Sequence, residues 1–273
     1  MYVPPSLPVK AVLNNDAPIA VSLSGLRLER GGRVVLDGLD LSVAEGSITA
    51  VIGPSGSGKS TLLAALTGEL QPAAGQVSVF GAPLPPPGRG LLSLRKRIGV
   101  LLQGNGLLTD LTAGENVALP LETHTALPRQ IVDVLVGMKL HAVGLGQAAG
   151  LYPRELSGGM ARRVALARAL ALDPPLMIYD EPLTGLDPIA SGVIMSLIAR
   201  LNRTLGLTSI IVTHHVRETL PIADHAVMIA DGRIVFDGTP AELERSRDPL
   251  VRQFLDGDPD GPIAFDGTSR SAA

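Results

Sequence analysis

The sequence contains no cysteine and no tryptophan, and aromatic residues make up only 3% of its 273 residues. The absence of cysteine excludes a disulfide framework, a zinc site with thiolate ligands and a cysteine nucleophile. The scarcity of aromatic rings argues against proteins that bind single-stranded nucleic acid by stacking its bases. The net charge of −3 argues against electrostatic binding of nucleic acid, so we expect no nucleic-acid partner.

Long apolar runs are also missing. No stretch reaches the roughly 20 apolar residues that cross a bilayer, and the most apolar run, residues 164–172, is interrupted by Arg168. The first residues contain scattered prolines and no apolar segment, unlike a secretory signal. These absences predict a cytoplasmic protein.

The composition is that of a folded globular chain, with 45% hydrophobic and 18% charged residues. We expect a loose arm over residues 1–18, one domain over 19–255 and a mobile tail over 256–273. Within the domain, residues 104–172 show helical patterns without a clear strand, which predicts a helical subdomain.

Strands alternate with helices along the domain, which predicts an α/β fold with a mostly parallel sheet. Residues 19–43 instead read as antiparallel strands with glycine turns, and residues 82–90 as an exposed, proline-rich loop. Further strands are predicted at 47–52, 76–80, 98–102, 176–179, 208–213, 226–229 and 234–236. Helices are predicted at 59–67, 113–118, 129–140, 158–172, 188–204, 241–245 and 249–255.

A glycine-rich segment lies between the strand at 47–52 and the helix that follows it. It matches the pattern GxxxxGK[ST], in which glycines let backbone N–H groups point inward at phosphates. The start of the helix adds the positive end of its dipole. We expect Lys59 to reach the β- and γ-phosphates and Ser60 to bind Mg²⁺. The proposed site consists of Gly53, Pro54, Ser55, Gly56, Ser57, Gly58, Lys59, Ser60 and Thr61.

Two acidic residues end the buried strand at 176–179. The carboxyl ends of parallel strands face the ligand crevice, so Asp180 is placed to hold Mg²⁺ and Glu181 to polarise the attacking water. The alternative is a solvated acidic turn before Pro182, but the upstream phosphate loop favours the catalytic interpretation.

A second helix start offers another anion site. Ser157 is a suitable N-cap, and Gly158 and Gly159 leave backbone N–H groups accessible. A simple capped surface helix is the alternative, because one chain rarely needs two such sites for one nucleotide. The neighbouring Arg162 and Arg163 are predicted to lie on a solvated face.

Together these motifs resemble the ATP-binding subunits of ABC transporters, whose signature LSGGQ appears here as LSGGM at residues 156–160. The resemblance implies a P-loop NTPase with an ABC-type domain: a mostly parallel sheet, an antiparallel β subdomain and a helical insert. It identifies Gln103 as a sensor of Mg²⁺ and γ-phosphate, and His214 as a γ-phosphate contact. It also implies a head-to-tail homodimer, in which Ser157, Gly158 and Gly159 bind the partner's ATP, and assigns Asp187 to the D-loop.

A finer resemblance links residues 116–128, 156–169, 222–225 and 251–257 to Mla-type phospholipid transport ATPases. It implies a peripheral subunit on the cytoplasmic face of the inner membrane, driving an integral membrane permease together with an MCE-domain lipid-binding protein. The alternatives are an ABC transporter ATPase for another substrate and a soluble ABC ATPase outside transport. A small-molecule kinase is disfavoured by the signature helix and His214.

The sequence departs from the family pattern at two instructive positions. Arg30 stands where many members place an aromatic ring on adenine, which leaves the preference for ATP over GTP open. His215 follows His214 where Asp is usual, and we assign the γ-phosphate contact to His214 because it directly follows the strand. The basic segment 95–97 is expected to be a solvated face, the alternative being contact with the membrane partner.

Overall fold

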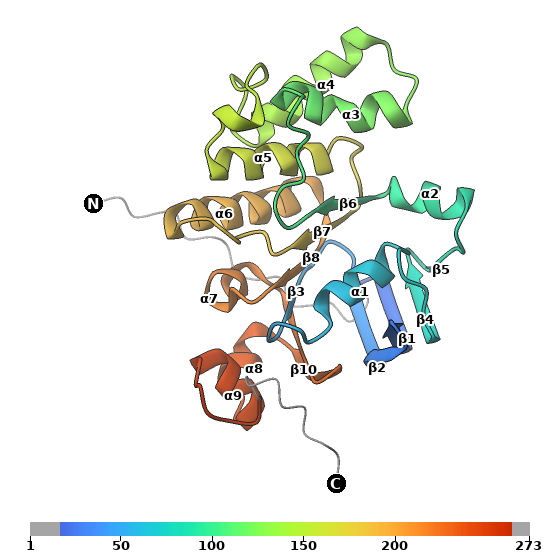
Figure 1. Ribbon diagram of the computed structural model, residues 1–273, viewed down its shortest axis with the longest axis vertical. Helices are drawn as coiled ribbons and strands as arrows, with labels where there is room; N and C mark the ends of the chain where they lie inside the picture. Colours follow the sequence, from blue (N-terminus) through green and yellow to red (C-terminus); the bar gives the residue numbers. More distant parts are fainter. Residues whose placement is uncertain (1–16, 264–273) are drawn as a thin grey trace.

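The computed structural model describes residues 17–263 as two β-sheets with helices packed on and between them (Figure 1). Most of the predicted N-terminal arm, residues 1–16, and the end of the predicted tail, residues 264–273, lie outside the described residues. Among those described, no helix is both long and apolar enough to cross a membrane.

The smaller sheet is four-stranded and antiparallel, in the order β2-β1-β4-β5. It comprises β1 (Ile19–Arg30), β2 (Arg33–Ala44), β4 (Ala74–Val79) and β5 (Ala82–Pro83). Leu26 and Leu28 of β1 and Leu36 of β2 are fully buried on the face that packs on the rest of the molecule. The predicted antiparallel start of the domain is therefore confirmed.

The larger sheet is six-stranded, in the order β10-β9-β3-β8-β7-β6. Its strands are β3 (Ile48–Ile52), β6 (Ile98–Leu101), β7 (Leu176–Asp180), β8 (Thr208–Thr213), β9 (His225–Ala230) and β10 (Arg233–Gly238). Every pair is parallel except β9 with β10. All residues of β3 and β8 are buried, because helices cover both faces of the sheet. The predicted mostly parallel α/β fold is confirmed.

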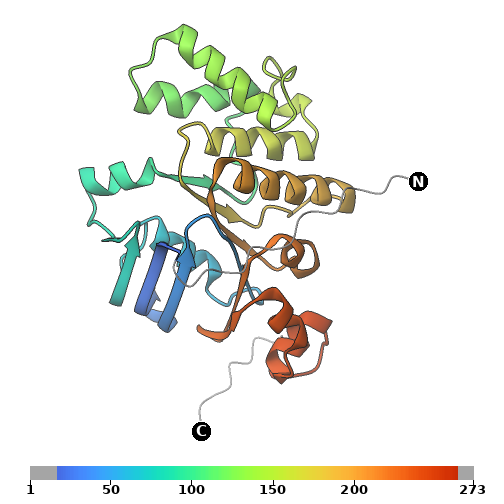
Figure 2. The same ribbon diagram turned by 180° about the vertical axis from the view of Figure 1, so that it is seen from behind.

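Helices cover the large sheet from two sides, as the opposite views in Figures 1 and 2 show. Helix α1 (Lys59–Leu66) packs its leucines between the two sheets. Helix α6 (Pro188–Leu205) buries Ile194 and Ile198 on the other side. Short elements complete the chain: α7 (Val216–Thr219), α8 (Pro240–Arg245), α9 (Pro249–Asp256) and the 3-10 turns η1 (Pro153–Glu155) and η2 (Leu220–Ile222).

Three helices stack at one end of the molecule: α3 (Ala113–His124), α4 (Arg129–Ala142) and α5 (Gly158–Ala169). Helix α3 starts with a capping box between Thr112 and Glu115. It runs through Pro120, beyond its predicted end at residue 118, because Val117 and Leu121 are buried in the core shared with α5. Burial of these side chains outweighs the backbone hydrogen bond that proline cannot make.

Two predictions of irregular chain differ from the structure. The predicted loop at 82–90 is mostly exposed, as expected, but it begins with β5 and ends in the first residues of α2 (Arg89–Arg95), which buries Leu91. The first part of the predicted tail is anchored: Ile263 N donates to Gln253 Oε1 at 2.6 Å, and Gln253 Nε2 donates to Ile263 O at 3.1 Å. In both segments a long-range contact organises residues whose local sequence favours a loop.

Gly99 on β6 and Gly137 on α4 provide a matched test of this packing. A Cβ at Gly99 would lie 2.3 Å from Met177 Sδ and 2.6 Å from Ala169 O, whereas one at Gly137 would meet nothing within 4 Å. We expect Gly99→Ala to destabilise the fold by about 1–3 kcal/mol through overpacking. The control Gly137→Ala should stabilise it by about 0.5–1 kcal/mol, because glycine weakens a helix. Urea unfolding measures both, and equal effects would contradict the packing at β6.

Candidate active site

The glycine-rich loop connects β3 to α1 and requires glycine at two positions. Gly53 has φ 149°, and a Cβ there would lie 2.0 Å from Ile229 O. Gly58 has φ 100°, and its Cβ would lie 2.5 Å from Leu36 Cδ2. Both residues adopt backbone conformations that other residues rarely reach. The loop therefore curls tightly against β9 and β2, as a phosphate cradle requires.

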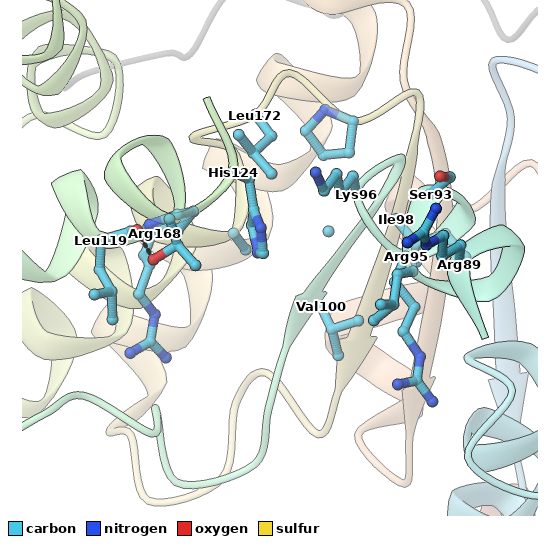
Figure 3. Close-up of a pocket in the computed structure, with 16 residues that line it drawn as sticks. Arg89, Ser93, Arg95, Lys96, Ile98, Val100, Leu119, His124, Arg168 and Leu172 are labelled. Carbon is cyan, nitrogen blue, oxygen red and sulfur yellow. Dashed lines mark hydrogen bonds between the residues drawn. The ribbon is translucent and has the colours of Figure 1, made fainter. Parts of the chain in front are cut away.

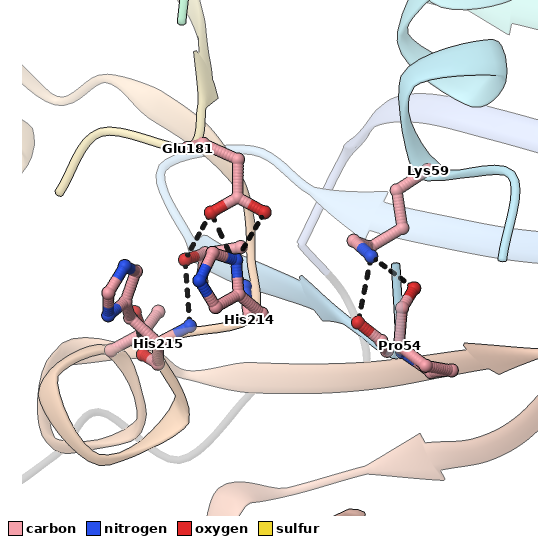
Figure 4. A network of polar contacts seen from close by, with 8 residues as sticks. Pro54, Lys59, Glu181, His214 and His215 are labelled. Atoms are coloured by element: carbon pink, nitrogen blue, oxygen red, sulfur yellow. Dashed lines mark hydrogen bonds and ion pairs between the residues drawn. The ribbon is translucent and has the colours of Figure 1, made fainter. Parts of the chain in front are cut away.

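Lys59 begins α1 and folds back over this loop. Its Nζ donates to Gly53 O at 2.7 Å and Pro54 O at 2.8 Å (Figure 4). Burial lowers the pKa of Lys59, while the charges of Glu181 and Asp180 oppose that shift. The ammonium is thus held at the loop by carbonyl oxygens, which are weaker partners than a phosphate would be.

Glu181 follows β7 and meets residues at the end of the adjacent β8. Thr213 Oγ1 donates to Glu181 Oε2 at 3.0 Å, and His214 Nδ1 lies 2.9 Å from Glu181 Oε1. The backbone of Glu181 has φ 47°, a left-handed conformation that is strained for a non-glycine residue. Its side chain is 13% exposed. The residue is therefore held in one orientation at the rim of a cleft.

Asp180 provides a test of whether the site fits a divalent cation. Its Oδ1 is buried and has no hydrogen-bond partner within residues 17–263. Burial, and then the charge of Glu181, raise the pKa of Asp180, while Lys59 opposes them. An unpaired buried acceptor is costly, and carboxylate, hydroxyl and amide oxygens are the ligands that Mg²⁺ prefers. Asp180, with the Ser60 hydroxyl and the Gln103 amide, has the donor chemistry for that ion.

A cleft of about 340 Å³ brings together the phosphate loop and three residues predicted from distant segments, Gln103, Glu181 and His214. The cleft is also lined by three residues that were not predicted from the sequence, Val35, Thr184 and Val212. They carry no motif, and only the sheet topology places them there. Arg30 does not line this cleft: it lies at the β1–β2 turn, paired with Arg33.

A second cleft of about 270 Å³ contains the other predicted anion site. Its lining includes Ser157, Gly158, Gly159 and Asp187, and it shares no residue with the first cleft. Ser157 Oγ accepts from Met160 N at 3.3 Å, and Asp187 Oδ1 accepts from Ile189 N and Ala190 N at 2.9 Å. Both side chains cap helices here. The two predicted anion sites of one chain therefore lie in separate clefts.

Arg162 corrects one prediction. We expected it on a solvated face, but its side chain is buried and donates to Leu102 O at 3.2 Å and Thr184 O at 3.0 Å. Burial lowers its pKa. These bonds fix the residue before Gln103 and the segment after Glu181 to helix α5. Arg162 therefore has a structural role, because it supplies hydrogen-bond donors to backbone carbonyls near the site.

A phosphate loop, an acidic strand end and a separate signature helix, on a parallel sheet with an antiparallel subdomain, define an ABC-type ATP-binding domain. The ABC transporter family profile matches residues 36–184, and the chain belongs to this family. It is accordingly an ATP-hydrolysing enzyme.

Individual relatives and solved structures agree with this assignment. The chain is 51% identical over 246 residues to the intermembrane phospholipid transport system ATP-binding protein MlaF of Haemophilus influenzae, covering 90% of this chain and 93% of that protein. It is 48% identical to MlaF of Escherichia coli K12, covering 90% and 91%. CbiO1 of Clostridium perfringens superposes with a TM-score of 0.79 at 27% identity, covering 88% and 96%. A dimeric bacterial ABC transporter cassette superposes with a TM-score of 0.73 at 30% identity, covering 81% and 98%.

Replacing Glu181 with Gln tests its role. The amide keeps the shape of the side chain but cannot accept a proton from water, so we expect ATP turnover to fall roughly 10²–10⁴-fold, the usual worth of a general base. An ATP-bound dimer should accumulate. Phosphate release and size-exclusion chromatography measure the two effects, with the exposed Glu218→Gln as control. Full turnover by Glu181→Gln would refute the assignment.

Proposed function

We propose that this protein is the ATPase subunit of an intermembrane phospholipid transport system, acting through a separate integral membrane permease on the cytoplasmic face of the inner membrane. The observation that carries the proposal is the 51% identity with the H. influenzae phospholipid transport ATPase over nearly the full length of both chains. Identity is lower, at 35%, to a probable ribonucleotide transport ATP-binding protein of Mycobacterium leprae. The comparison therefore favours phospholipid over another substrate.

The first cleft binds ATP in this proposal. The phosphates take the place of the Gly53 and Pro54 carbonyls at Lys59 Nζ, and the curled backbone after Pro54, residues 55–58, donates its N–H groups. Ser60, Gln103 and Asp180 would hold Mg²⁺, which supplies neutralisation of phosphate charge when bound. The burial and unpaired oxygen of Asp180 support its place in this set.

Glu181 acts as the general base in this proposal and His214 contacts the γ-phosphate. Glu181 Oε2 is held by Thr213, and Oε1 faces the His214 ring. The carboxylate thus receives its orientation from β8 and accepts a proton from the attacking water. Arg30 lies outside this cleft, so its proposed contact with the base of the nucleotide, by stacking of the guanidinium on an aromatic face, requires the base to extend beyond the cleft.

We propose that two chains complete each ATP site. The signature residues lie in a cleft separate from the phosphate loop, so neither cleft in one chain contains both sets. A head-to-tail homodimer would place Ser157, Gly158, Gly159 and Asp187 of one chain against the nucleotide of the other. The dimeric assembly of a cassette 30% identical to this chain supports this arrangement.

The permease is proposed to dock in a groove of about 820 Å³ between α2 and the helical end of the molecule (Figure 3). Its lining combines the basic side chains of Arg89, Arg95 and Lys96 with the apolar side chains of Leu92 and Leu119. This chemistry suits an amphipathic segment with acidic residues. It favours the partner-contact alternative for the basic segment 95–97. An MCE-domain lipid-binding protein is a further proposed partner, on the resemblance to Mla systems.

Two hydrogen bonds connect this groove to segments that lead to the ATP site. Arg95 Nε donates to Thr67 O at 2.9 Å, at the end of the helix that Lys59 begins. Arg168, on the opposite side of the groove, donates to Asn105 O at 3.0 Å, close to Gln103. Movement of a docked partner would therefore reach helix α1 and the segment after Gln103 through short, directional contacts.

A mixed dimer tests the shared site. Ser157→Arg should block turnover while its own phosphate loop still binds ATP, and Lys59→Ala should lose ATP binding. Combining one chain of each kind leaves one site with both an intact phosphate loop and an intact signature. We expect the mixed dimer to hydrolyse ATP although each variant alone does not. Full activity of the single variants, or an inactive mixed dimer, would contradict sharing. Phosphate release from tagged, co-purified dimers measures the outcome.

Leu92→Glu tests docking of the permease. Leu92 is 57% exposed within the groove, and Leu205 on α6 is 50% exposed outside it. A charge at Leu92 should reduce co-purification with a membrane permease by about tenfold or more, the effect of 1.4 kcal/mol or more, whereas Leu205→Glu should not. Affinity purification from solubilised membranes measures both. Recovery with ribosomes and no membrane protein would refute a transport function.

A further inference from the structure

His215 is a sequence departure that the proposed ATPase mechanism leaves without a role. The structure places it beside two residues of the catalytic cleft, with potential ligand atoms of Glu181, His214 and His215 all within 4.8 Å of one another. The rings of His214 and His215 lie 4.3 Å apart between centroids and are tilted by 34°. Figure 4 shows the two imidazoles next to each other, with the His214 ring against the Glu181 carboxylate.

We propose that Glu181, His214 and His215 bind a transition-metal ion of the class that prefers imidazole, with Zn²⁺ as its representative, and that this ion inhibits ATP hydrolysis. Two imidazoles and one carboxylate are a common zinc ligand set, with a fourth position left for water. Mg²⁺ prefers oxygen ligands. The proposed site is therefore distinct in chemistry from the Mg²⁺ site at Asp180, Ser60 and Gln103.

The geometry is close to what such an ion requires. Tetrahedral zinc with bonds of about 2.0–2.1 Å separates its ligand atoms by about 3.3 Å, and His214 Nδ1 already lies 2.9 Å from Glu181 Oε1. His215 is the ligand whose ring must still move closer to the other two. Its imidazole makes no hydrogen bond within the described part of the chain, so the ring can turn without breaking one.

The surroundings orient the ligands and leave the site accessible. The backbone of His215 is fixed, because its N–H donates to Thr213 Oγ1 at 3.0 Å and its carbonyl accepts from Thr219 Oγ1 at 2.8 Å. The same Thr213 hydroxyl donates to Glu181 Oε2 and supports the carboxylate. The His214 side chain is 50% exposed, so an ion can enter from solvent.

The charge balance also favours a cation. Glu181 supplies one negative charge at the site. Lys59 is the nearby cation, since the charge of Glu181 acts to raise its pKa. Its ammonium does not pair with Glu181 but donates to the carbonyls of Gly53 and Pro54 (Figure 4). Metal binding requires unprotonated imidazole and carboxylate. The bound ion would therefore occupy the groups that hydrolysis needs. This inhibitory consequence depends on the proposed roles of Glu181 and His214, whereas binding of the ion does not.

Zinc binding can be measured directly on the full, nucleotide-free chain by competition with a chromophoric chelator. We expect one Zn²⁺ per chain, and affinity at least about tenfold weaker for His215→Asn, which removes one of three ligands. The exposed His141→Asn is the matched control and should bind like the parent chain. Thermal unfolding shows that each variant is folded. Absence of zinc binding, or equal affinity in the parent and His215→Asn, would overturn the proposal.

Inhibition is measured by phosphate release at buffered free Zn²⁺ with Mg·ATP in excess, relative to each chain without zinc. The parent and His141→Asn should be inhibited at zinc concentrations at least about tenfold lower than His215→Asn, following their affinities. Full activity of the zinc-loaded parent would overturn the inhibitory part and leave the binding site. If Glu181→Gln also retains full turnover, the fault lies in the proposed role of Glu181.

Discussion

Parallel pairing of β3, β8 and β7 is the constraint on which the rest of the site depends. Hydrogen bonding in register places Ile52 beside Thr213 and Asp180 beside Val212. The carboxyl ends of the three strands therefore lie at one edge of the sheet, where the phosphate loop, the acidic pair and the histidine follow them. Because these strands are buried on both faces, a shift in register would disturb the core. The packing of the core therefore fixes the positions of the site residues.

Arginine side chains join this edge to the surrounding helices. Arg162 binds the carbonyls of Leu102 and Thr184, and Arg168 binds that of Asn105, so the segments after β6 and β7 are tied to α5. Arg95 makes a corresponding bond to the end of α1. Removing one of these donors would take a hydrogen bond from each carbonyl that it holds. The helical end of the molecule is thus mechanically connected to the nucleotide cleft, as expected for a subunit that transmits ATP hydrolysis to a partner.

Much of this arrangement follows from local patterns. Strands β3, β7 and β8 are short and each is centred on apolar residues, and the phosphate loop and signature helix have distinctive glycine spacing, so their places in the fold were predictable. The exposure of Arg162 was predicted wrongly, because an arginine on a helix is usually solvated and only the loops packed on α5 give this one carbonyl acceptors. The continuation of α3 through Pro120 and the formation of α2 likewise depend on packing partners distant in sequence.

The amino-acid sequence by itself predicted the phosphate loop, the acidic strand end and the capped signature helix, because backbone freedom at glycine, helix capping and acidic strand ends are local properties. The resemblance to ABC transporter ATPases then indicated the class of the domain and the roles of Gln103 and His214. The tertiary structure decided which of these residues meet. It brought Gln103, Glu181 and His214 to the phosphate loop, kept the signature residues and Arg30 outside that cleft, and set His215 beside the carboxylate. Strand order and register determine those distances, and both depend on packing across the whole sheet.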